Sequence, residues 1–154
     1  MIKLRRVEEL VEEKISETDQ FVVEIKVNPK NEILILLDTM NGSVSVSDCM
    51  AVSRWVERNI DREEEDYKLE VSSPGLDKPF KVKKQFSKNV GRQVIMKLND
   101  AREIKGELLT VDQELVEIKT KEKVKIGKKK QWQEAVEKIN FDEIEEAKVV
   151  ISFK

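Results

Sequence analysis

The chain of 154 residues lacks histidine entirely and contains a single cysteine, Cys49. Histidine is the commonest general base and the commonest metal ligand, so both kinds of chemistry lose their usual residue. One thiolate can neither assemble a zinc site nor close an internal disulfide, which is typical of a reducing compartment. We therefore predict no catalytic residue, no metal site and no cofactor, and we expect Cys49 to pack as a small apolar residue.

Long hydrophobic runs are also missing, because no stretch approaches the roughly 20 apolar residues that a membrane span needs. The first residues, MIKLRRVEELVEEK, become acidic and helical where a signal peptide would carry an apolar block. The sequence therefore predicts a cytoplasmic protein without membrane contact. Hydrophobic residues make up 39% of the chain, which is enough to build packed cores.

Charge is present in both signs, but the two halves of the chain differ. Residues 1–77 contain 10 Lys and Arg against 18 Asp and Glu, a net charge of −8. Residues 78–154 contain 19 against 13, a net charge of +6. Such asymmetry indicates two units with different surfaces, of which the basic one is a candidate for nucleic-acid contact.

The beginning of the acidic half predicts a helix followed by a hairpin. Apolar residues recur at spacings of three and four from Val7 to Ile15, the pattern of an amphipathic helix. Strands are expected over residues 21–27 and 32–39, joined by an Asn-Pro-Lys-Asn turn. The second strand is apolar almost throughout, which is typical of a strand buried on both faces.

A second helix and a third strand complete the acidic unit. Ser47 suits the N-cap of the helix, and Val52 and Val56 lie on its predicted buried stripe. Residues 67–71 alternate between apolar and polar side chains, as a half-buried strand does. The order α-β-β-α-β predicts an α+β fold with its helices on one face of a small sheet.

The basic half reads as a small β-barrel. Gly106, inside one of its runs, marks the bend or bulge that barrel closure needs. Short strands at this density are typical of small barrels. The predicted strands cover residues 92–98, 103–111, 114–120, 123–126 and 147–153.

The two units meet at YKLEVSSPGLDKPF, residues 67–80. Pro74 fits the second position of a type II turn and Gly75 the third, where φ must be positive. Pro79 holds Lys78 extended, so we expect a stiff linker between a domain of residues 1–79 and a domain of residues 80–154. The predicted linker and partner-contact residues are Ser72, Ser73, Pro74, Gly75, Leu76, Asp77, Lys78 and Pro79.

Three segments of the chain carry one family pattern. They are LEVSSPG with the following Asp77 and Lys78, GSVSVSDCMAVSRWV, and GRQVIMKL with the later KGELLTVD. Together they resemble the ribosome maturation factor family RimP over essentially the whole chain. Lys78 stands where that family usually has Arg, and residues 121–138 look like an insertion.

The resemblance implies an N-terminal α+β domain and a C-terminal barrel of the SH3 or Sm kind. The α-β-β-α-β order of the first unit is itself a KH-like layout. The five glycines form no Gly-x-x-Gly, so the phosphate-clamping loop of KH domains is absent. The resemblance also implies a non-catalytic factor for assembly of the small (30S) ribosomal subunit. Its implied partners are the immature subunit, through 16S rRNA, and a ribosomal protein near the decoding centre. We expect a monomer.

Basic residues run from Lys78 to Lys97 without any acidic one. Phosphate contact explains this run, although a solvated lysine surface is the simpler alternative. A second set of lysines lies between Lys119 and Lys130, beside Trp132. Basic residues next to an aromatic ring are typical of a surface that stacks bases, but a lysine-rich hairpin that protects a barrel edge is an equally good interpretation. The residues predicted to contact RNA or the ribosome are Lys81, Lys83, Lys84, Lys88, Arg92, Lys97, Lys128, Lys129 and Lys130.

Two other functions fit the sequence less well. Ser72, Ser73, Asp77 and Lys78 offer a hydroxyl and a base, but no oxyanion cradle or orienting third group is evident, so turn building is the better interpretation. An oligomeric Sm-like regulatory RNA-binding protein, unrelated to ribosome assembly, is the alternative function. Cofractionation with free small ribosomal subunits would favour an assembly factor over this alternative.

Overall fold

The structure is a computed structural model that describes residues 1–75 and 77–151. The chain divides into two compact units, Met1–Gly75 and Leu76–Lys154. No helix in the described part of the chain is both long and apolar enough to cross a bilayer. The predicted α+β class is confirmed, because helices and strands alternate in the first unit and strands dominate the second.

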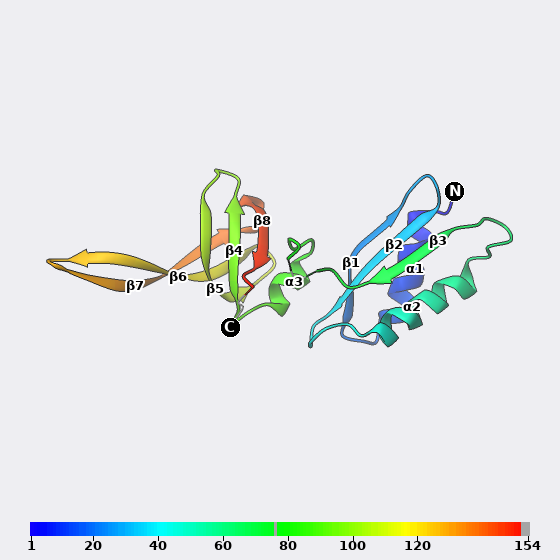
Figure 1. Cartoon of the computed structure of the whole chain (residues 1–154), viewed down its shortest axis with the longest axis horizontal. Coiled ribbons are helices and arrows are strands. Elements are labelled where there is room, and N and C mark those ends of the chain that lie inside the picture. Colours follow the sequence, from blue (N-terminus) through cyan, green and yellow to red (C-terminus); the bar gives the residue numbers. More distant parts are fainter. Residues whose placement is uncertain (76, 152–154) are drawn as a thin grey trace. The chain divides into compact units, whose positions relative to one another are not determined.

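The first unit has the order helix, two strands, helix, strand (Figure 1). Strand β2 lies at the centre of the sheet, antiparallel to β1 and parallel to β3. Strand β3 therefore forms one edge. The elements are α1 (Leu4–Ile15), β1 (Gln20–Val27), β2 (Glu32–Thr39), α2 (Val46–Asn59) and β3 (Lys68–Ser72).

One core lies between the helices and the sheet of this unit. The apolar stripe of α1 is buried as its spacing predicts, and Val52 and Val56 of α2 join the same cluster. Ile33, Ile35 and Leu37 of β2 are at most 2% exposed and face these helices. Both helices therefore cover the same face of the sheet.

Two details of the first unit differ from the sequence prediction. Strand β2 is fully buried on one face only, because Leu34 and Leu36 on the opposite face are half-buried. The N-cap of α2 is Ser45 rather than Ser47. The Ser45 hydroxyl accepts from the Asp48 amide at 3.0 Å, and the Asp48 carboxylate accepts from the Ser45 amide at 3.1 Å, a complete capping box. Ser45 is the N-cap because it lies three residues before Asp48, the spacing that allows both hydrogen bonds.

The second unit is built on five antiparallel strands in the order β7-β6-β5-β4-β8. Its core contains apolar residues from all five strands, together with Phe86 of α3. Strand β7 contributes Ile139, near its end. Phe86 makes edge-to-face contacts with Phe80 and Phe141, at centroid distances of 4.9 and 5.1 Å. The elements are α3 (Lys83–Lys88), β4 (Gln93–Leu98), β5 (Glu103–Val111), β6 (Leu115–Ile126), β7 (Lys129–Asn140), η1 (Phe141–Glu143) and β8 (Ile144–Val149).

The strand predictions for the second unit were partly wrong. The expected strands 114–120 and 123–126 are one continuous strand, β6, and the presumed insertion contains most of β7. The last strand is β8, which ends at Val149; residues 152 and 153 of the predicted strand lie outside the described residues. Across the described residues the ladders run from β7 to β8 without a pairing that closes them into a barrel.

Candidate binding surfaces

The predicted linker residues begin at the end of β3. Ser72 is the last residue of that strand, and residues 73–75 have no regular structure. Asp77 and Lys78 are exposed and Pro79 is half-buried, while Leu76 lies outside the described residues. Of this set, Ser72 and Ser73 line a groove on the first unit.

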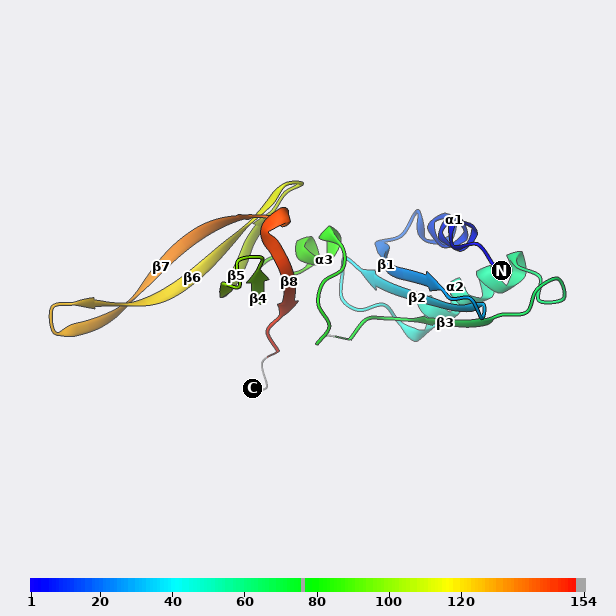
Figure 2. The same ribbon diagram turned by 90° about the horizontal axis from the view of Figure 1, so that it is seen from above.

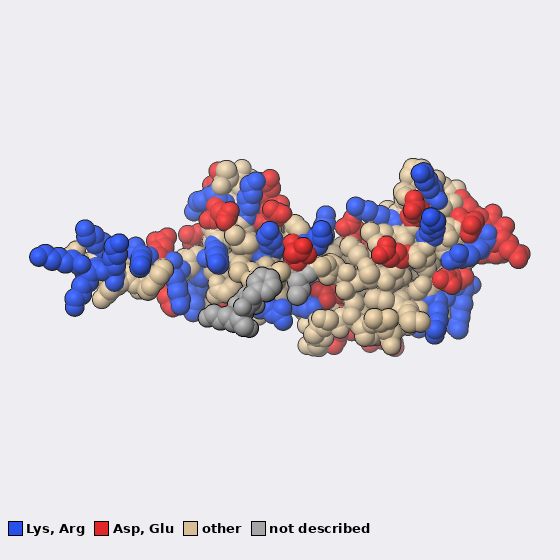
Figure 3. Space-filling view, in the orientation of Figure 1, with Lys and Arg blue, Asp and Glu red and all other residues tan. Residues whose placement is uncertain are grey.

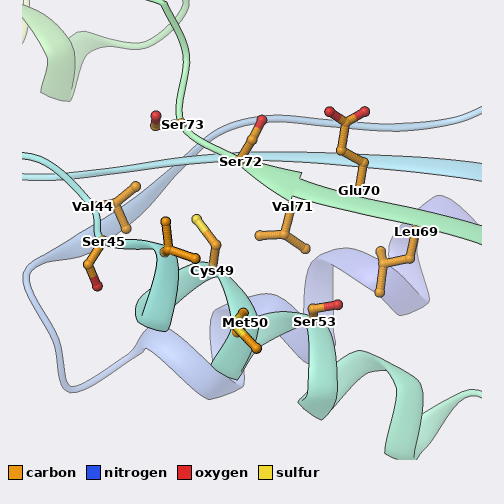
Figure 4. Close-up of a pocket in the computed structure, with 11 residues that line it drawn as sticks. Val44, Ser45, Cys49, Met50, Ser53, Leu69, Glu70, Val71, Ser72 and Ser73 are labelled. Carbon is orange, nitrogen blue, oxygen red and sulfur yellow. The ribbon is translucent and has the colours of Figure 1, made fainter.

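That groove has a volume of about 450 Å³ and lies between β3 and the first turns of α2 (Figure 4). Leu69 and Val71 point from β3 toward α2, whereas Glu70 and Ser72 point away from it. The remaining wall comes from α2 and the loop before it. The lining residues are Val44, Ser45, Val46, Cys49, Met50, Ser53, Leu69, Glu70, Val71, Ser72 and Ser73.

The groove combines apolar surface with an open sheet edge. Val46 and Met50 at its rim are 78% and 46% exposed, so apolar surface at the groove is open to solvent. In the described part of the chain, β3 pairs with β2 alone, so the main-chain groups along its other side face outward. An edge strand beside apolar pockets is the arrangement that receives an extended peptide.

Cys49 lines this groove but does not offer a reactive thiolate. Burial raises the pKa of the Cys49 thiol, and the neighbouring Asp48 carboxylate raises it further. The thiol is therefore protonated at neutral pH and behaves as a small apolar group. This agrees with the packing role that the sequence indicates.

The basic run from Lys78 to Lys97 is distributed over several elements of the second unit. The Lys83 ammonium donates to the Gln113 carbonyl at 2.6 Å and lies 4.9 Å from the Phe141 ring centroid. Lys97 lies 4.0 Å from the carboxylate of Glu145. These two cations therefore already have contacts within the unit.

The other basic residues of this run lie around α3 and its ends. Lys81 and Lys84 are exposed, and Lys88 is half-buried. Arg92 is exposed and directs one guanidinium nitrogen to the side-chain oxygen of Asn89 at 3.4 Å. The exposed members of the set remain candidates for contact with an anionic partner.

Strands β6 and β7 continue beyond the sheet as a two-stranded ribbon, which we call the arm, residues 119–136 (Figure 2). Pairing between β5 and β6 stops at Glu107 and Lys119, whereas β6 and β7 stay paired as far as Ile126 and Lys129. Gly127 opens the terminal loop with a φ of 62°. The predicted contacts Lys128, Lys129 and Lys130 lie at this tip.

The arm brings together residues that the sequence prediction treated separately. Cross-strand partners in a ladder share a face of the ribbon, and the register pairs Lys123 with Trp132. The alternate lysines of β6 therefore lie on the face of Trp132. Their period of two was visible in the sequence, but its meaning depends on β7, which was not predicted.

Among the residues that the structure describes, no group of three His, Cys, Asp or Glu side chains could hold a metal ion. Ser72 and Ser73 of the linker line the open groove beside β3.

Comparison with known proteins gives one family. A family model described as the RimP N-terminal domain matches residues 7–77. The chain is 38% identical over 151 residues to the ribosome maturation factor RimP of Christiangramia forsetii, and 40% identical over 151 residues to that of Flavobacterium psychrophilum. Each match covers 96% of this chain and 97% of the relative.

The RimP of Porphyromonas gingivalis is 34% identical over 125 residues, 81% of this chain and 82% of the relative. Matches to the first two relatives span both compact units, and the family model covers nearly all of the first. The chain therefore belongs to the RimP family.

Proposed function

We propose that this protein is a maturation factor for the small (30S) ribosomal subunit that binds immature particles without catalysing a reaction. The observation that carries the proposal is the identity of 38–40% to ribosome maturation factors over nearly the full chain. The open groove on the first unit and the lysines of the second support binding rather than catalysis.

The two units suit different components of a ribonucleoprotein. The acidic domain, residues 1–79, would receive a basic ribosomal protein near the decoding centre, with the groove and the linker residues Ser72–Pro79 as the contact surface. The basic domain, residues 80–154, would contact 16S rRNA. In this proposal the first domain has a KH-like layout without the phosphate loop, and the second is related to SH3 and Sm folds.

The mechanism is a shift of populations. A factor favours one conformer of immature rRNA only to the extent that it binds that conformer more tightly than its competitors. Basic side chains that meet phosphates release counterions, so the preference depends on salt. The proposed contacts are Lys81, Lys83, Lys84, Lys88, Arg92, Lys97, Lys128, Lys129 and Lys130.

The proposal is tested by binding of the purified protein to immature and mature small subunits in sedimentation assays. We expect it to cosediment with immature subunits, to bind mature subunits less, and to lose binding as salt rises. A double variant, Lys81→Glu with Lys84→Glu, should weaken binding and flatten its salt dependence. Lys81 and Lys84 are exposed, and Lys83 is left unchanged so that its contacts with Gln113 and Phe141 are kept.

The matched control is Lys3→Glu with Lys30→Glu, which changes the net charge equally on exposed positions of the first unit. It should leave RNA-driven binding nearly unchanged. Equal affinity for immature and mature subunits would refute the proposal. A ring-shaped oligomer that binds short RNAs but no subunits would favour the Sm-like alternative.

A further inference from the structure

The arm extends past the hydrophobic core of its own unit. On β6 the inward side chains Val116, Ile118 and Thr120 are buried, and burial of this strand ends there. Beyond Thr120 the ribbon has no third strand in the described part of the chain. A lone two-stranded ribbon is marginally stable in water, so its length has no explanation in the packing of the fold.

The two faces of the arm differ in charge. The outer face is the one that carries Trp132, and its cross-strand pairs are Lys119 with Val136, Lys121 with Glu134, Lys123 with Trp132, and Lys125 with Lys130. These pairs place five lysines and one acid on the outer face. The opposite face carries Glu122, Val124 and Ile126 on β6, opposite glutamines and a lysine of β7.

This arrangement is unfavourable for the free arm. Successive lysines on one side of a strand lie about 7 Å apart, and like charges on neighbouring side chains repel. Glu134 lies 4.0 Å from Lys119 and offsets only part of the charge. Figure 3 shows basic side chains gathered along the arm. A polyanion that lies along the outer face removes this repulsion.

Trp132 adds a flat aromatic surface to the lysine row. Its side chain is 66% exposed, and the Lys123 ammonium lies 5.4 Å from its ring centroid. Burying this ring in the core would have been the usual outcome for tryptophan. An exposed indole between lysines is the combination that stacks unpaired bases while cations hold the phosphates.

A recess lies beside Trp132 where the arm leaves the sheet. Its volume is about 460 Å³, within the range of small-molecule sites. Gly106 of β5 lies in its wall, and a Cβ at that position would clash with the Lys119 carbonyl. The recess is lined by Gln93, Lys105, Gly106, Glu107, Lys119, Lys121 and Trp132.

We propose that the outer face of the arm binds unpaired RNA, with one base stacked on Trp132 at the recess and the adjoining phosphates on Lys119, Lys121 and Lys123. The inference rests on the proposed function, because the immature subunit would supply this RNA. Unpaired RNA is favoured over a duplex, whose bases are stacked on one another and leave Trp132 without a partner. It is favoured over an acidic peptide, which would use the lysines but not the indole face.

The test uses the full chain and a fluorescently labelled single-stranded oligoadenylate of twelve nucleotides. Trp132→Ala should weaken binding roughly 5- to 150-fold, the range for loss of one stacked base. Trp132→Phe should restore most of the affinity, because phenylalanine keeps a stacking face. Lys121→Gln with Lys123→Gln should reduce the slope of log affinity against log salt by about 1.4, or 0.7 for each phosphate contact.

Trp132 fluorescence provides a second readout in a Trp55→Phe background, since these are the two tryptophans of the chain. Stacking should quench it when RNA binds. The matched control for the lysine pair is Lys3→Gln with Lys30→Gln, which should leave the slope unchanged. Equal affinity of Trp132→Ala and the parent protein would overturn the proposal, as would equally tight binding of a twelve-base-pair duplex or of polyglutamate.

A deletion separates this inference from the proposed function. Removing residues 121–126 and 129–134 joins Gly127 and Lys128 as a loop to the cross-strand pair Thr120 and Ala135. That pair lies an even number of residues from Ile126 and Lys129, so it has the same hydrogen-bonding pattern and can take the same loop. The deletion should abolish oligonucleotide binding and keep the core. If the parent protein binds immature subunits but not the oligonucleotide, the arm proposal fails alone. If it binds the oligonucleotide through Trp132 but shows no preference for immature subunits, the proposed function fails and the arm proposal holds.

Discussion

The first unit and the arm show two different relations between sequence and structure. In the first unit, two helices and a three-stranded sheet share one buried core, and most apolar residues have a place in it. In the arm, twelve-residue strands extend past their core, and the large apolar side chains Ile126, Trp132 and Val136 are exposed. Burial of apolar side chains therefore accounts for the fold of the first unit, whereas the exposed apolar side chains of the arm are available to a binding partner.

The same contrast occurs within the single strand β6. Its inner half alternates buried and half-buried residues from Leu115 to Thr120, and its outer half from Lys121 is exposed except at Val124. In both halves the side chains of β6 alternate between the two faces of the strand, but only in the inner half does one face pack against a hydrophobic core. The arm and the core should respond very differently to truncation of apolar side chains.

The largest expected effect is loss of the core of the first unit. Leu37 is completely buried, so Leu37→Ala should lower the free energy of unfolding by about 2–5 kcal/mol. Val124→Ala in the arm should change it by less than about 0.5 kcal/mol. Urea denaturation followed by circular dichroism measures both. Similar losses for the two variants would remove the distinction between core and arm.

The junction between sheet and arm should be the next most sensitive point. Gly106→Ala places a methyl group against the Lys119 carbonyl, and overpacking of this kind costs about 1–3 kcal/mol. Gly127→Ala is the comparison, because a Cβ there has no neighbour within 4 Å among the described residues. Gly127→Ala is unfavourable because of the φ of 62° at the arm tip. Gly106→Ala should therefore reduce the protection of the β5 amides from hydrogen exchange, whereas Gly127→Ala should leave that protection unchanged. Loss of that protection in both variants would contradict the prediction.

A smaller effect distinguishes the two candidate helix caps of the first unit. Ser45→Ala should lower stability by about 1 kcal/mol, because it removes the hydroxyl that accepts from the Asp48 amide. Ser47→Ala, in the first turn of the same helix, should be close to neutral. Thermal denaturation of the two variants decides between the serines, and a greater loss for Ser47→Ala would show that the capping box does not stabilise the helix.

The smallest effect concerns acid stability of the β5–β6 turn. Backbone hydrogen bonds from Leu115 and then Glu114 hold the pKa of Asp112 below its ordinary value of 3.8. A lowered folded-state pKa adds stability that is present above the ordinary pKa and is lost as pH falls through the folded value. Asp112→Asn should therefore flatten the loss of stability below about pH 4, since its side chain no longer titrates.

Glu114→Gln is the control for this measurement, because it removes a carboxylate from the same turn without removing the Asp112 acceptor. Its acid limb should resemble that of the parent protein. If the two variants have identical acid limbs, the hydrogen bonds to Asp112 do not contribute.

Local pattern predicted the first unit well because its signals agree with one another. The helical spacing from Val7 to Ile15 predicts a helix that is confirmed but begins three residues earlier, at Leu4. The two hairpin strands and the strand predicted over residues 67–71 are confirmed within one residue. The N-cap was misassigned, because three serines precede or begin α2 and only the hydrogen bonds with Asp48 distinguish them. Burial on both faces of β2 was predicted from composition, which does not show whether a second layer exists.

The second unit was predicted less well for a physical reason. Strand β7 is rich in Lys, Gln and Glu, with little of the β-branched and aromatic content that marks buried strands. It is held by its ladder to β6 across the turn at Gly127 and Lys128, and the polar composition of β7 did not indicate that it continues this ladder as a strand of twelve residues. The candidate site on the arm was therefore seen as a set of lysines near a tryptophan, without the face that unites them.

The sequence by itself determined the α+β class, the acidic and basic halves, the resemblance to the RimP family and the buried residues of α1. These follow from composition, periodicity and local turn chemistry, which act over a few neighbouring residues. Only the structure decided that β3 and α2 enclose a groove, which serine caps α2, and which lysines share a face with Trp132. The groove depends on packing between elements that are distant in sequence, and the cap depends on the two hydrogen bonds between Ser45 and Asp48. The lysine face depends on the register of β6 against β7, which the short turn at Gly127 fixes.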